Sequence, residues 1–113
     1  MMMTRVQLLR VYLHEGDRYE DRPAYVALIE RLRAAGVTGA SVFKGIEGFG
    51  GSGTVHSARV FDLSTNLPVV VEVIESTEKI TAILPILHET LASGLLTLEG
   101  VEILRLPAMG EKR

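Results

Sequence analysis

Apolar residues along the chain follow two periods, and the first of them is typical of β-strands. Segments rich in β-branched, aromatic and leucine residues recur at 6–13, 39–46, 69–74 and 101–106, a composition that favours extended backbone. A shorter strand-like segment follows a glycine-rich stretch, at 57–63. We therefore predict four main strands.

The second period is close to 3.6 residues and predicts two helices between these strands. The apolar stripes consist of Tyr25, Leu28, Ile29 and Leu32 in the first helix, and of Ile80, Ile83, Leu84, Leu87 and Leu91 in the second. A stripe of this width is typical of a helix that covers one face of a sheet.

The first helix has recognisable end signals. Asp21 is a candidate N-cap, Pro23 falls in the first turn, and Gly36 is the expected stop, in line with the preference for proline near the start of a helix and glycine just after its end. These signals predict a helix over about 22–35.

The ends of the second helix are also marked, but its middle is not settled by the pattern. Ser76 or Thr77 is the expected N-cap, and Ser93-Gly94 is the expected stop. Pro85 lies between them and lacks a backbone N–H, so it usually kinks or splits a helix. The continuity of this helix therefore stays open.

The order of elements is βαββαβ, which is the ferredoxin-like arrangement of the α+β class. Right-handed crossovers place both helices on one face of a four-stranded antiparallel sheet. Yet the strands at 6–13 and 69–74 are apolar on both faces, whereas a strand with one face in water should alternate. We therefore expect a homo-oligomer that covers the second face. The alternative is that β-propensity alone explains the valines.

Composition and charge narrow the class of protein. The 113 residues are 47% hydrophobic and 23% charged, which suits one globular domain over 1–113, with its core in 5–106 and a polar C-terminal tail at 107–113. Twelve basic and 14 acidic residues give a net charge of −2, which does not favour nucleic acid. The chain contains no cysteine and no apolar run of about 18 residues, so we expect a cytoplasmic protein with no membrane insertion.

The segment from Gly45 to Gly53 contains five glycines, both ends included, and is the least ordinary part of the chain. Glycine permits positive φ and close backbone approach, so successive N–H groups can surround an anion. Gly48-x-Gly50-x-x-Gly53 matches the dinucleotide fingerprint literally, but a strand-like segment follows where that motif requires a helix. The alternative is a mobile hairpin tip that binds nothing.

Charged residues near this segment suggest an anionic ligand. Lys44 and Arg59 flank it, and Arg10 and Arg105 lie on outer strands; together they form a candidate anion-binding cluster. His56 follows the glycines and is a candidate partner of Glu47. The three histidines lack metal-ligand spacing, and no nucleophile with its base is visible. We therefore expect a binding protein and not an enzyme.

Three segments carry a resemblance to a known family. Residues 9–19 (Leu-Arg-Val-Tyr-Leu-x-Glu-x-Asp-Arg-Tyr), 39–50 (Gly-Ala-Ser-Val-x-Lys-Gly-Ile-Glu-Gly-Phe-Gly) and 67–73 (Leu-Pro-Val-Val-Val-Glu-Val) resemble the family called domain of unknown function 190. The resemblance covers about residues 5–106. That family is in turn similar to the nitrogen-regulatory PII signalling proteins.

The resemblance to PII-like proteins implies a homotrimer with a cleft between subunits at the base of the loop. It implies a small anionic ligand there, with AMP, ADP or ATP as the candidates, and a loop that controls a protein partner, either a transporter or an enzyme. The ligand-binding residues expected on this basis are Lys44, Gly45, Glu47, Gly48, Phe49, Gly50, His56 and Arg59. The loop has no tyrosine that could be modified covalently.

A second hypothesis comes from a different class of protein. The CutA copper-tolerance proteins have the same fold and use exposed histidine and carboxylate side chains, so the chain also resembles a metal-binding or structural trimer. This hypothesis requires His56 to lie near a carboxylate.

Overall fold

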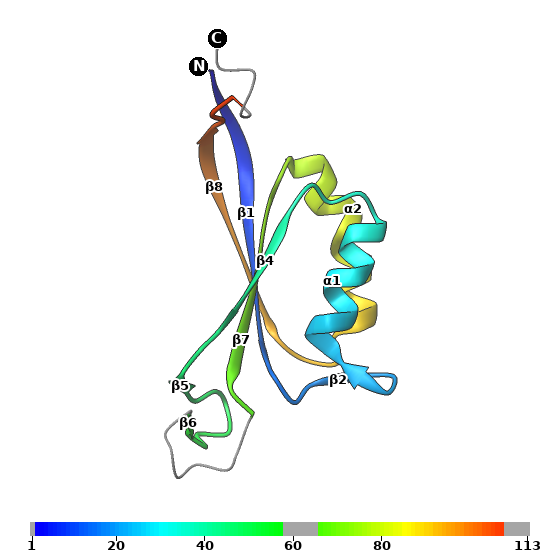
Figure 1. Ribbon diagram of the computed structural model, residues 1–113, viewed down its shortest axis with the longest axis vertical. Coiled ribbons are helices and arrows are strands. Elements are labelled where there is room, and N and C mark those ends of the chain that lie inside the picture. The colour runs from blue at the N-terminus through cyan, green and yellow to red at the C-terminus, as the bar shows by residue number, and fades with distance from the viewer. Residues whose placement is uncertain (1, 58–65, 108–113) are drawn as a thin grey trace.

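The computed structural model describes residues 2–57 and 66–107, and it has two helices on one face of an antiparallel sheet (Figure 1). The strands of the main sheet lie in the order β4-β7-β1-β8. In chain order the elements are β1 (Met3–His14), β2 (Arg18–Tyr19), β3 (Arg22–Pro23), α1 (Ala24–Ala34), β4 (Ala40–Lys44), β5 (Glu47–Gly48), β6 (His56–Ser57), β7 (Pro68–Glu75), α2 (Thr77–Thr90) and β8 (Leu95–Leu104). The predicted ferredoxin-like fold is confirmed.

The hydrophobic core lies between the main sheet and the two helices. Alternate residues of β1 and β7 point toward the helices, and the antiparallel register places Val11 opposite Val71 and Leu9 opposite Val73. The buried cluster consists of Leu9, Val11, Leu13, Ala24, Leu28, Leu32, Val69, Val71, Val73, Ile80, Ile83 and Leu87. The predicted apolar stripes of both helices therefore supply the cover of one sheet face, except for Leu84, which was predicted in the stripe of the second helix but is 37% exposed.

The limits of α1 differ from the prediction at the start and agree with it at the end. Asp21 lies in the turn between β2 and β3, and Pro23 occupies the N-cap position without a side-chain hydrogen bond. The N–H of Ala24 is instead bonded to the carbonyl of Asp17, at 2.7 Å. Gly36, with φ +87°, follows the last turn, as expected of a glycine stop.

Helix α2 runs without interruption from Thr77 to Thr90 despite Pro85. Ser76 is the N-cap, and its hydroxyl accepts the N–H of Lys79 at 3.2 Å. Pro85 lies on the exposed side of the helix, where water can bond the carbonyl that has lost its helical partner. Buried Ile83 and Leu87 flank the proline and hold the helix on the sheet.

Strand β8 begins earlier than predicted. Its pairing with β1 extends from Met3 opposite Leu104 to Tyr12 opposite Leu95, so the strand covers ten residues where the sequence pattern indicated 101–106. The leucines and Gly100 in its first part lack the β-branched signature, and the long partner strand imposes the extended conformation on them. Of the predicted strand at 57–63, the described part is Ser57 in β6; residues 58–63 lie outside the described ranges.

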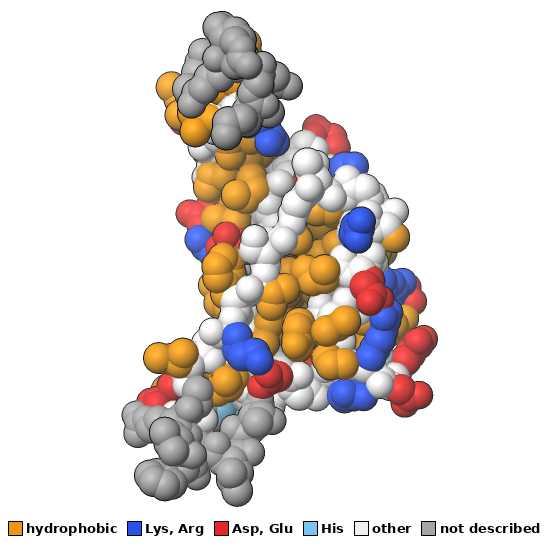
Figure 2. Space-filling model, in the orientation of Figure 1, with side chains coloured by type: hydrophobic (Ala, Val, Ile, Leu, Met, Phe, Trp, Pro, Cys, Tyr) orange, Lys and Arg blue, Asp and Glu red, His pale blue; other side chains and the backbone are white. Residues whose placement is uncertain are grey.

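The sheet face opposite the helices is here called the bare face. Its exposed apolar side chains include Tyr12, Phe43, Ile74 and Leu95, and Figure 2 shows hydrophobic side chains uncovered along the strands away from the helices. In its middle, Arg10 lies 3.2 Å from a carboxylate oxygen of Glu72 and 2.8 Å from one of Glu99. The apolar character of both sheet faces is therefore present in the fold, and the occupant of the second face remains a prediction.

Helices of the described ranges are too short and too polar to span a membrane. The molecule is elongated, with principal extents of 52 × 31 × 24 Å. The glycine-rich segment projects from one end of the main sheet, and the start of β1 and the end of β8 lie at the other end (Figure 1).

Candidate functional site

The glycine-rich segment forms a loop arm (residues 45–57) that leaves β4 and is closed by the short β5–β6 ribbon. In this ribbon Glu47 pairs with Ser57 and Gly48 with His56. The Ser57 hydroxyl also donates a hydrogen bond to the Glu47 carboxylate at 3.0 Å. The ribbon is a separate two-stranded sheet, so the arm has its own internal pairing beyond the end of the main sheet.

Two glycines at the base of the arm are required by close packing. A Cβ atom on Gly45 or on Gly48 would lie 2.9 Å from Cγ of Pro68, closer than real side chains approach. The N–H of Gly45 also donates a hydrogen bond to the carbonyl of Pro68, at 2.7 Å. Gly45 and Gly48 therefore hold the arm against the start of β7. The sequence predicted these glycines as anion contacts and did not predict this structural role.

The glycines at the tip of the arm have a different environment. Gly53 adopts φ +76°, and its N–H donates to the carbonyl of Gly50 at 2.9 Å to close a turn. A Cβ atom on Gly51 would have nothing within 4 Å. The tip therefore uses glycine for one backbone conformation and leaves open space around Gly51.

A pocket of about 430 Å³, here called the arm pocket, lies between the arm and the end of the main sheet. Its lining comes from four separate places in the chain: the arm, the end of β1 with the turn after it, the start of β7, and the start of β8. The lining residues used below are Phe49, Gly50 and Gly51 from the arm, His14 and Asp17 from the β1 end, and Ser93, Gly94 and Leu95 from the β8 start. Two of the predicted site residues, Phe49 and Gly50, therefore line the same pocket.

His14 and His56 meet where the arm lies against β1. Their ring centroids are 6.0 Å apart and the planes are inclined by 68°, an edge-to-face arrangement. The backbone N–H of His14 donates to the carboxylate of Asp17 at 3.0 Å. His56 was expected at the site, but His14 and Asp17 were not, because a polar turn after a strand gives no sign of which distant segment it will face.

Lys44 has a partner outside the arm pocket. Its Nζ lies 2.5 Å from Oε2 of Glu15. The hydrogen bond from Lys44 lowers the pKa of Glu15, burial opposes this, and the N–H of Leu67 lowers it further; the same pair raises the pKa of Lys44. Lys44 therefore ties the end of β4 to the turn after β1, with its charge matched by a carboxylate.

We predicted that four basic side chains form an anion-binding cluster. This prediction is wrong for the three that the structure describes, because they lie in separate parts of the molecule. Arg10 lies on the bare face between two glutamates, Lys44 pairs with Glu15, and Arg105 borders a groove of about 440 Å³ at the other end of the sheet. Arg59 lies outside the described residues. That groove is as large as the arm pocket, but none of the predicted site residues lines it.

Within residues 2–57 and 66–107, no group of three or more His, Asp or Glu side chains gathers in a way that could hold a metal ion. Glu47 and His56 are neighbours in the ribbon, but a metal centre needs further donors. The arm pocket is therefore described by its backbone, its aromatic rings and the single carboxylate of Asp17.

Comparison with known proteins gives relatives of nearly the same length. A UPF0166 protein of Aquifex aeolicus (strain VF5) is 38% identical over 106 residues, covering 94% of this chain and all of the relative. A UPF0166 protein of Methanocaldococcus jannaschii is 38% identical over 92 residues, covering 81% of this chain and 84% of the relative.

Among solved structures, CPII of Thiomonas intermedia K12, a nitrogen regulatory PII-like protein bound to ADP, AMP and bicarbonate, has a similar fold. The TM-score is 0.67 with 15% sequence identity, and 92% of each chain is covered. At this identity the likeness concerns the fold alone. Residues 6–103 match the family DUF190, described as Uncharacterized ACR, COG1993, so the chain belongs to the DUF190 family and has the fold of the PII-like proteins.

Proposed function

We propose that the protein is a PII-like regulatory protein that binds an adenine nucleotide, AMP, ADP or ATP, in the arm pocket. The observation that carries the proposal is the pocket itself, because its walls come from the arm and from three strand ends of the main sheet, those of β1, β7 and β8. A ligand between these walls would bind the arm to the body of the protein. CPII, which has the same fold, was crystallised with ADP and AMP.

The lining of the arm pocket suits the parts of a nucleotide. Phe49 is 73% exposed and offers an aromatic face for stacking on a base. His14 lines the pocket and is a donor for a phosphate group, together with backbone N–H groups at the tip of the arm. His56 is not among the lining residues and lies edge-to-face with the His14 ring. The Asp17 carboxylate can accept a hydrogen bond from a ribose hydroxyl.

The other predicted site residues have supporting roles in this proposal. Gly45 and Gly48 fix the base of the arm on Pro68, Glu47 holds the ribbon closed through Ser57, and Lys44 anchors β4 through Glu15. Arg59, outside the described residues, remains a candidate phosphate contact. We assign no catalytic residue, and the proposed role is regulation of a transporter or an enzyme.

The proposal includes a homotrimer and a docking role for the arm. The bare face supplies apolar surface for contact between copies, and Ile46, Phe49 and Val55 are exposed apolar side chains on the arm. Ordering of such a segment by a ligand changes the surface that a partner meets. Nucleotide occupancy of the arm pocket would in this way control the partner.

The test compares two glycines by calorimetric titration with ADP and AMP. Gly48→Ala places a Cβ against Pro68 and displaces the base of the arm, so we expect affinity to fall about tenfold or more. Gly39, just before β4, does not line the arm pocket, and Gly39→Ala adds the same methyl group where nothing lies within 4 Å, so its affinity should match the wild type within about twofold.

Two outcomes would contradict the proposal. Equal affinities for Gly48→Ala and Gly39→Ala would remove the arm from the binding site. A wild-type protein that takes up neither nucleotide but binds Zn²⁺ or Cu²⁺ would favour the metal-binding alternative. Thermal unfolding of each variant serves as the control for folding, since a bound ligand raises Tm only if the native site is intact.

A further inference from the structure

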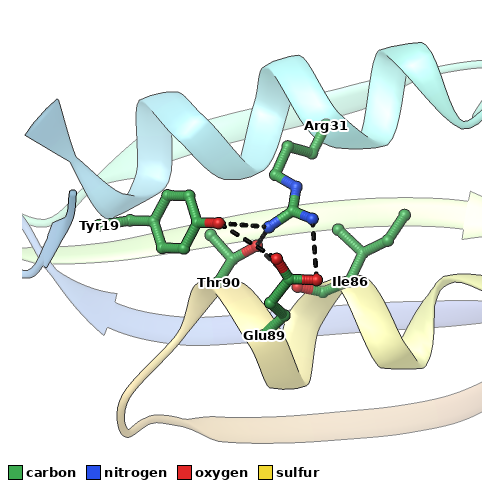
Figure 3. A network of polar contacts seen from close by, with 5 residues as sticks. All are labelled: Tyr19, Arg31, Ile86, Glu89 and Thr90. Atoms are coloured by element: carbon green, nitrogen blue, oxygen red, sulfur yellow. Dashed lines mark hydrogen bonds and ion pairs between the residues drawn. The ribbon is translucent and has the colours of Figure 1, made fainter.

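A polar network joins α1, α2 and the β2–β3 hairpin (Figure 3). Arg31 of α1 is its centre: Nη1 donates to the Tyr19 hydroxyl at 3.1 Å and to the Thr90 hydroxyl at 3.0 Å. Its Nη2 lies 3.0 Å from the Glu89 carboxylate. The Tyr19 hydroxyl in turn donates to Glu89 at 3.2 Å, which closes the network.

The network extends from a buried residue, Thr90, to the surface, where the Glu89 side chain is 62% exposed. Thr90 is 2% exposed and donates its hydroxyl hydrogen to the carbonyl of Ile86 at 2.6 Å. The Arg31 guanidinium carbon lies 5.3 Å from the centre of the Tyr19 ring, within the range of a cation–π contact. Arg31 holds the pKa of Glu89 below its usual value. Three different elements are therefore tied through one side chain.

Two of the three partners of Arg31, Tyr19 and Thr90, lie a few residues from a wall of the arm pocket. Tyr19 comes two residues after Asp17, which lines the pocket and whose carbonyl accepts the N–H of Ala24 at the start of α1, at 2.7 Å. On the other side, Thr90 is the last residue of α2, and the chain then passes to Ser93, Gly94 and Leu95, which form the β8 wall of the pocket.

Empty space separates these two walls behind the pocket. A cavity of about 80 Å³ is lined by Asp17, Arg18 and Ala24 on one side and by Leu91, Ala92 and Ser93 on the other. On the sheet side, the pairing of Tyr12 with Leu95 connects the two walls. On the helix side, side chains that leave a void between them lose mutual contact, so the separation of the walls there depends on the Arg31 network.

We infer that Arg31 is a positioning residue of the arm pocket: with Tyr19, Glu89 and Thr90 it holds the Asp17 wall and the Ser93–Leu95 wall at the separation the ligand requires. This inference rests on the proposed function for the identity of the ligand, but the tie itself is a property of the unliganded fold. Because coupling is reciprocal, ligand in the arm pocket would also strengthen the contact between α1 and α2.

The test replaces Arg31 and, as a matched control, Arg22. Arg31→Met keeps an apolar side chain over the Tyr19 ring, and the Thr90 hydroxyl keeps its bond to Ile86, so the fold should survive. Arg22→Met breaks the ion pair of Arg22 with Glu30, which joins the same hairpin to α1 but does not reach α2. The two variants therefore differ in whether the two walls remain tied.

Amide exchange measured by NMR on the protein without ligand reports the tie directly. The reporters are the N–H of Asp17, bonded to the carbonyl of His14, and the N–H of Leu91, bonded to the carbonyl of Leu87. In Arg31→Met we expect both to exchange about 3- to 30-fold faster, with Val11 in the core strand unchanged. In Arg22→Met all three should exchange at the wild-type rate.

Calorimetric titration with ADP then tests the effect on binding. We expect Arg31→Met to bind about 3- to 30-fold more weakly than both Arg22→Met and the wild type. Unchanged exchange at Asp17 and Leu91, or faster exchange with unchanged ADP affinity, would overturn the inference. If the wild type binds no nucleotide, the proposed function fails while the exchange data still decide whether Arg31 holds the walls.

A second variant, Glu89→Gln, keeps the acceptor for Tyr19 but removes the charge. It should raise the exchange rates and weaken ADP binding in the same direction as Arg31→Met, but by less.

Discussion

The two faces of the main sheet have similar apolar strands but different surroundings. On the face toward α1 and α2, Leu9 and Val71 are fully buried. On the bare face, Phe43, Ile74 and Leu95 are 54%, 43% and 62% exposed. Among the described residues of the bare face, only central positions of β1 such as Leu8, 9% exposed, are buried. The other apolar residues there lack the cover that the helices give to the opposite face, and an uncovered apolar face indicates a binding surface.

The bare face also differs from the covered face in carrying charge at its centre. Arg10 pairs there with Glu72 and Glu99, and their side chains remain between 30% and 55% exposed. Ion pairs at a contact surface add little to affinity but select the relative orientation of the partners. The combination of apolar residues with a charged centre suits a second copy of the same chain, since a self-complementary surface can meet both requirements.

The largest effect is expected on the covered face. Leu9→Ala removes a side chain that is 0% exposed and should lower the free energy of unfolding by about 2–5 kcal/mol, because a cavity remains where the helices meet the sheet. Urea denaturation measures the change. Leu95→Ala removes the same atoms from the bare face and should cost under about 1 kcal/mol in an isolated chain.

The comparison of these two leucines can also fail in an informative way. If Leu95→Ala costs as much as Leu9→Ala, and the cost depends on protein concentration, the bare face is as well covered in solution as the helix face. That result would support the homotrimer and remove the distinction between the two faces.

A smaller effect on stability, but a clear effect on assembly, is expected from a charge on the bare face. Ile74→Asp changes an exposed strand residue, so the single chain should lose no more than about 1 kcal/mol. If another copy covers this face, the carboxylate would be buried without a partner, and the assembly should dissociate. Light scattering should then give the mass of one chain, 12.3 kDa, in place of three times that value.

Ile46→Asp provides the control for this experiment. Ile46 is 78% exposed and lies on the loop arm, away from the bare face, so the same substitution there should leave the mass unchanged. Dissociation by Ile46→Asp and not by Ile74→Asp would move the contact between copies from the sheet to the arm.

The sequence predicted the parts of the fold that depend on local pattern. The stripes around Leu28 and Ile83 mark helices because the 3.6-residue period appears within a few turns of the chain itself. The continuity of α2 through Pro85 and the early start of β8 at Leu95 depend on tertiary contacts. Packing on both sides of the proline and pairing along β1 override the local preferences, and neither is visible in a short window.

Only part of the arm pocket could be predicted from the sequence, because most of its lining is also brought together by tertiary contacts. The glycines marked the arm, and Phe49 and Gly50 do line the pocket. His14 and Gly94 come from strand ends that only the register of the sheet brings to the arm: His14 pairs with Pro68, and Tyr12 with Leu95. The ion pair of Lys44 with Glu15 likewise joins separate elements, so no spacing in the sequence revealed it.

The smallest effect concerns a carboxylate at the margin of the covered face. Glu75 ends β7, and although burial raises its pKa, hydrogen bonds from Thr38 outweigh burial and hold the pKa below its usual value; the N–H of Thr38 lies 2.6 Å from Oε2. A carboxylate whose pKa is lowered in the folded protein stabilises the fold at pH values above its unfolded pKa of about 4.3. This contribution is lost as the pH falls through the pKa of the folded state.

Glu75→Gln keeps an acceptor for Thr38 but cannot ionise, so the wild type should be more stable at pH 7 by less than about 1 kcal/mol, since solvent screens a partly exposed group. Thermal unfolding of both proteins between pH 7 and pH 3 should show this difference shrinking below about pH 4.3. A constant difference over that range would mean that Thr38 and Glu75 are held together by packing and not by charge.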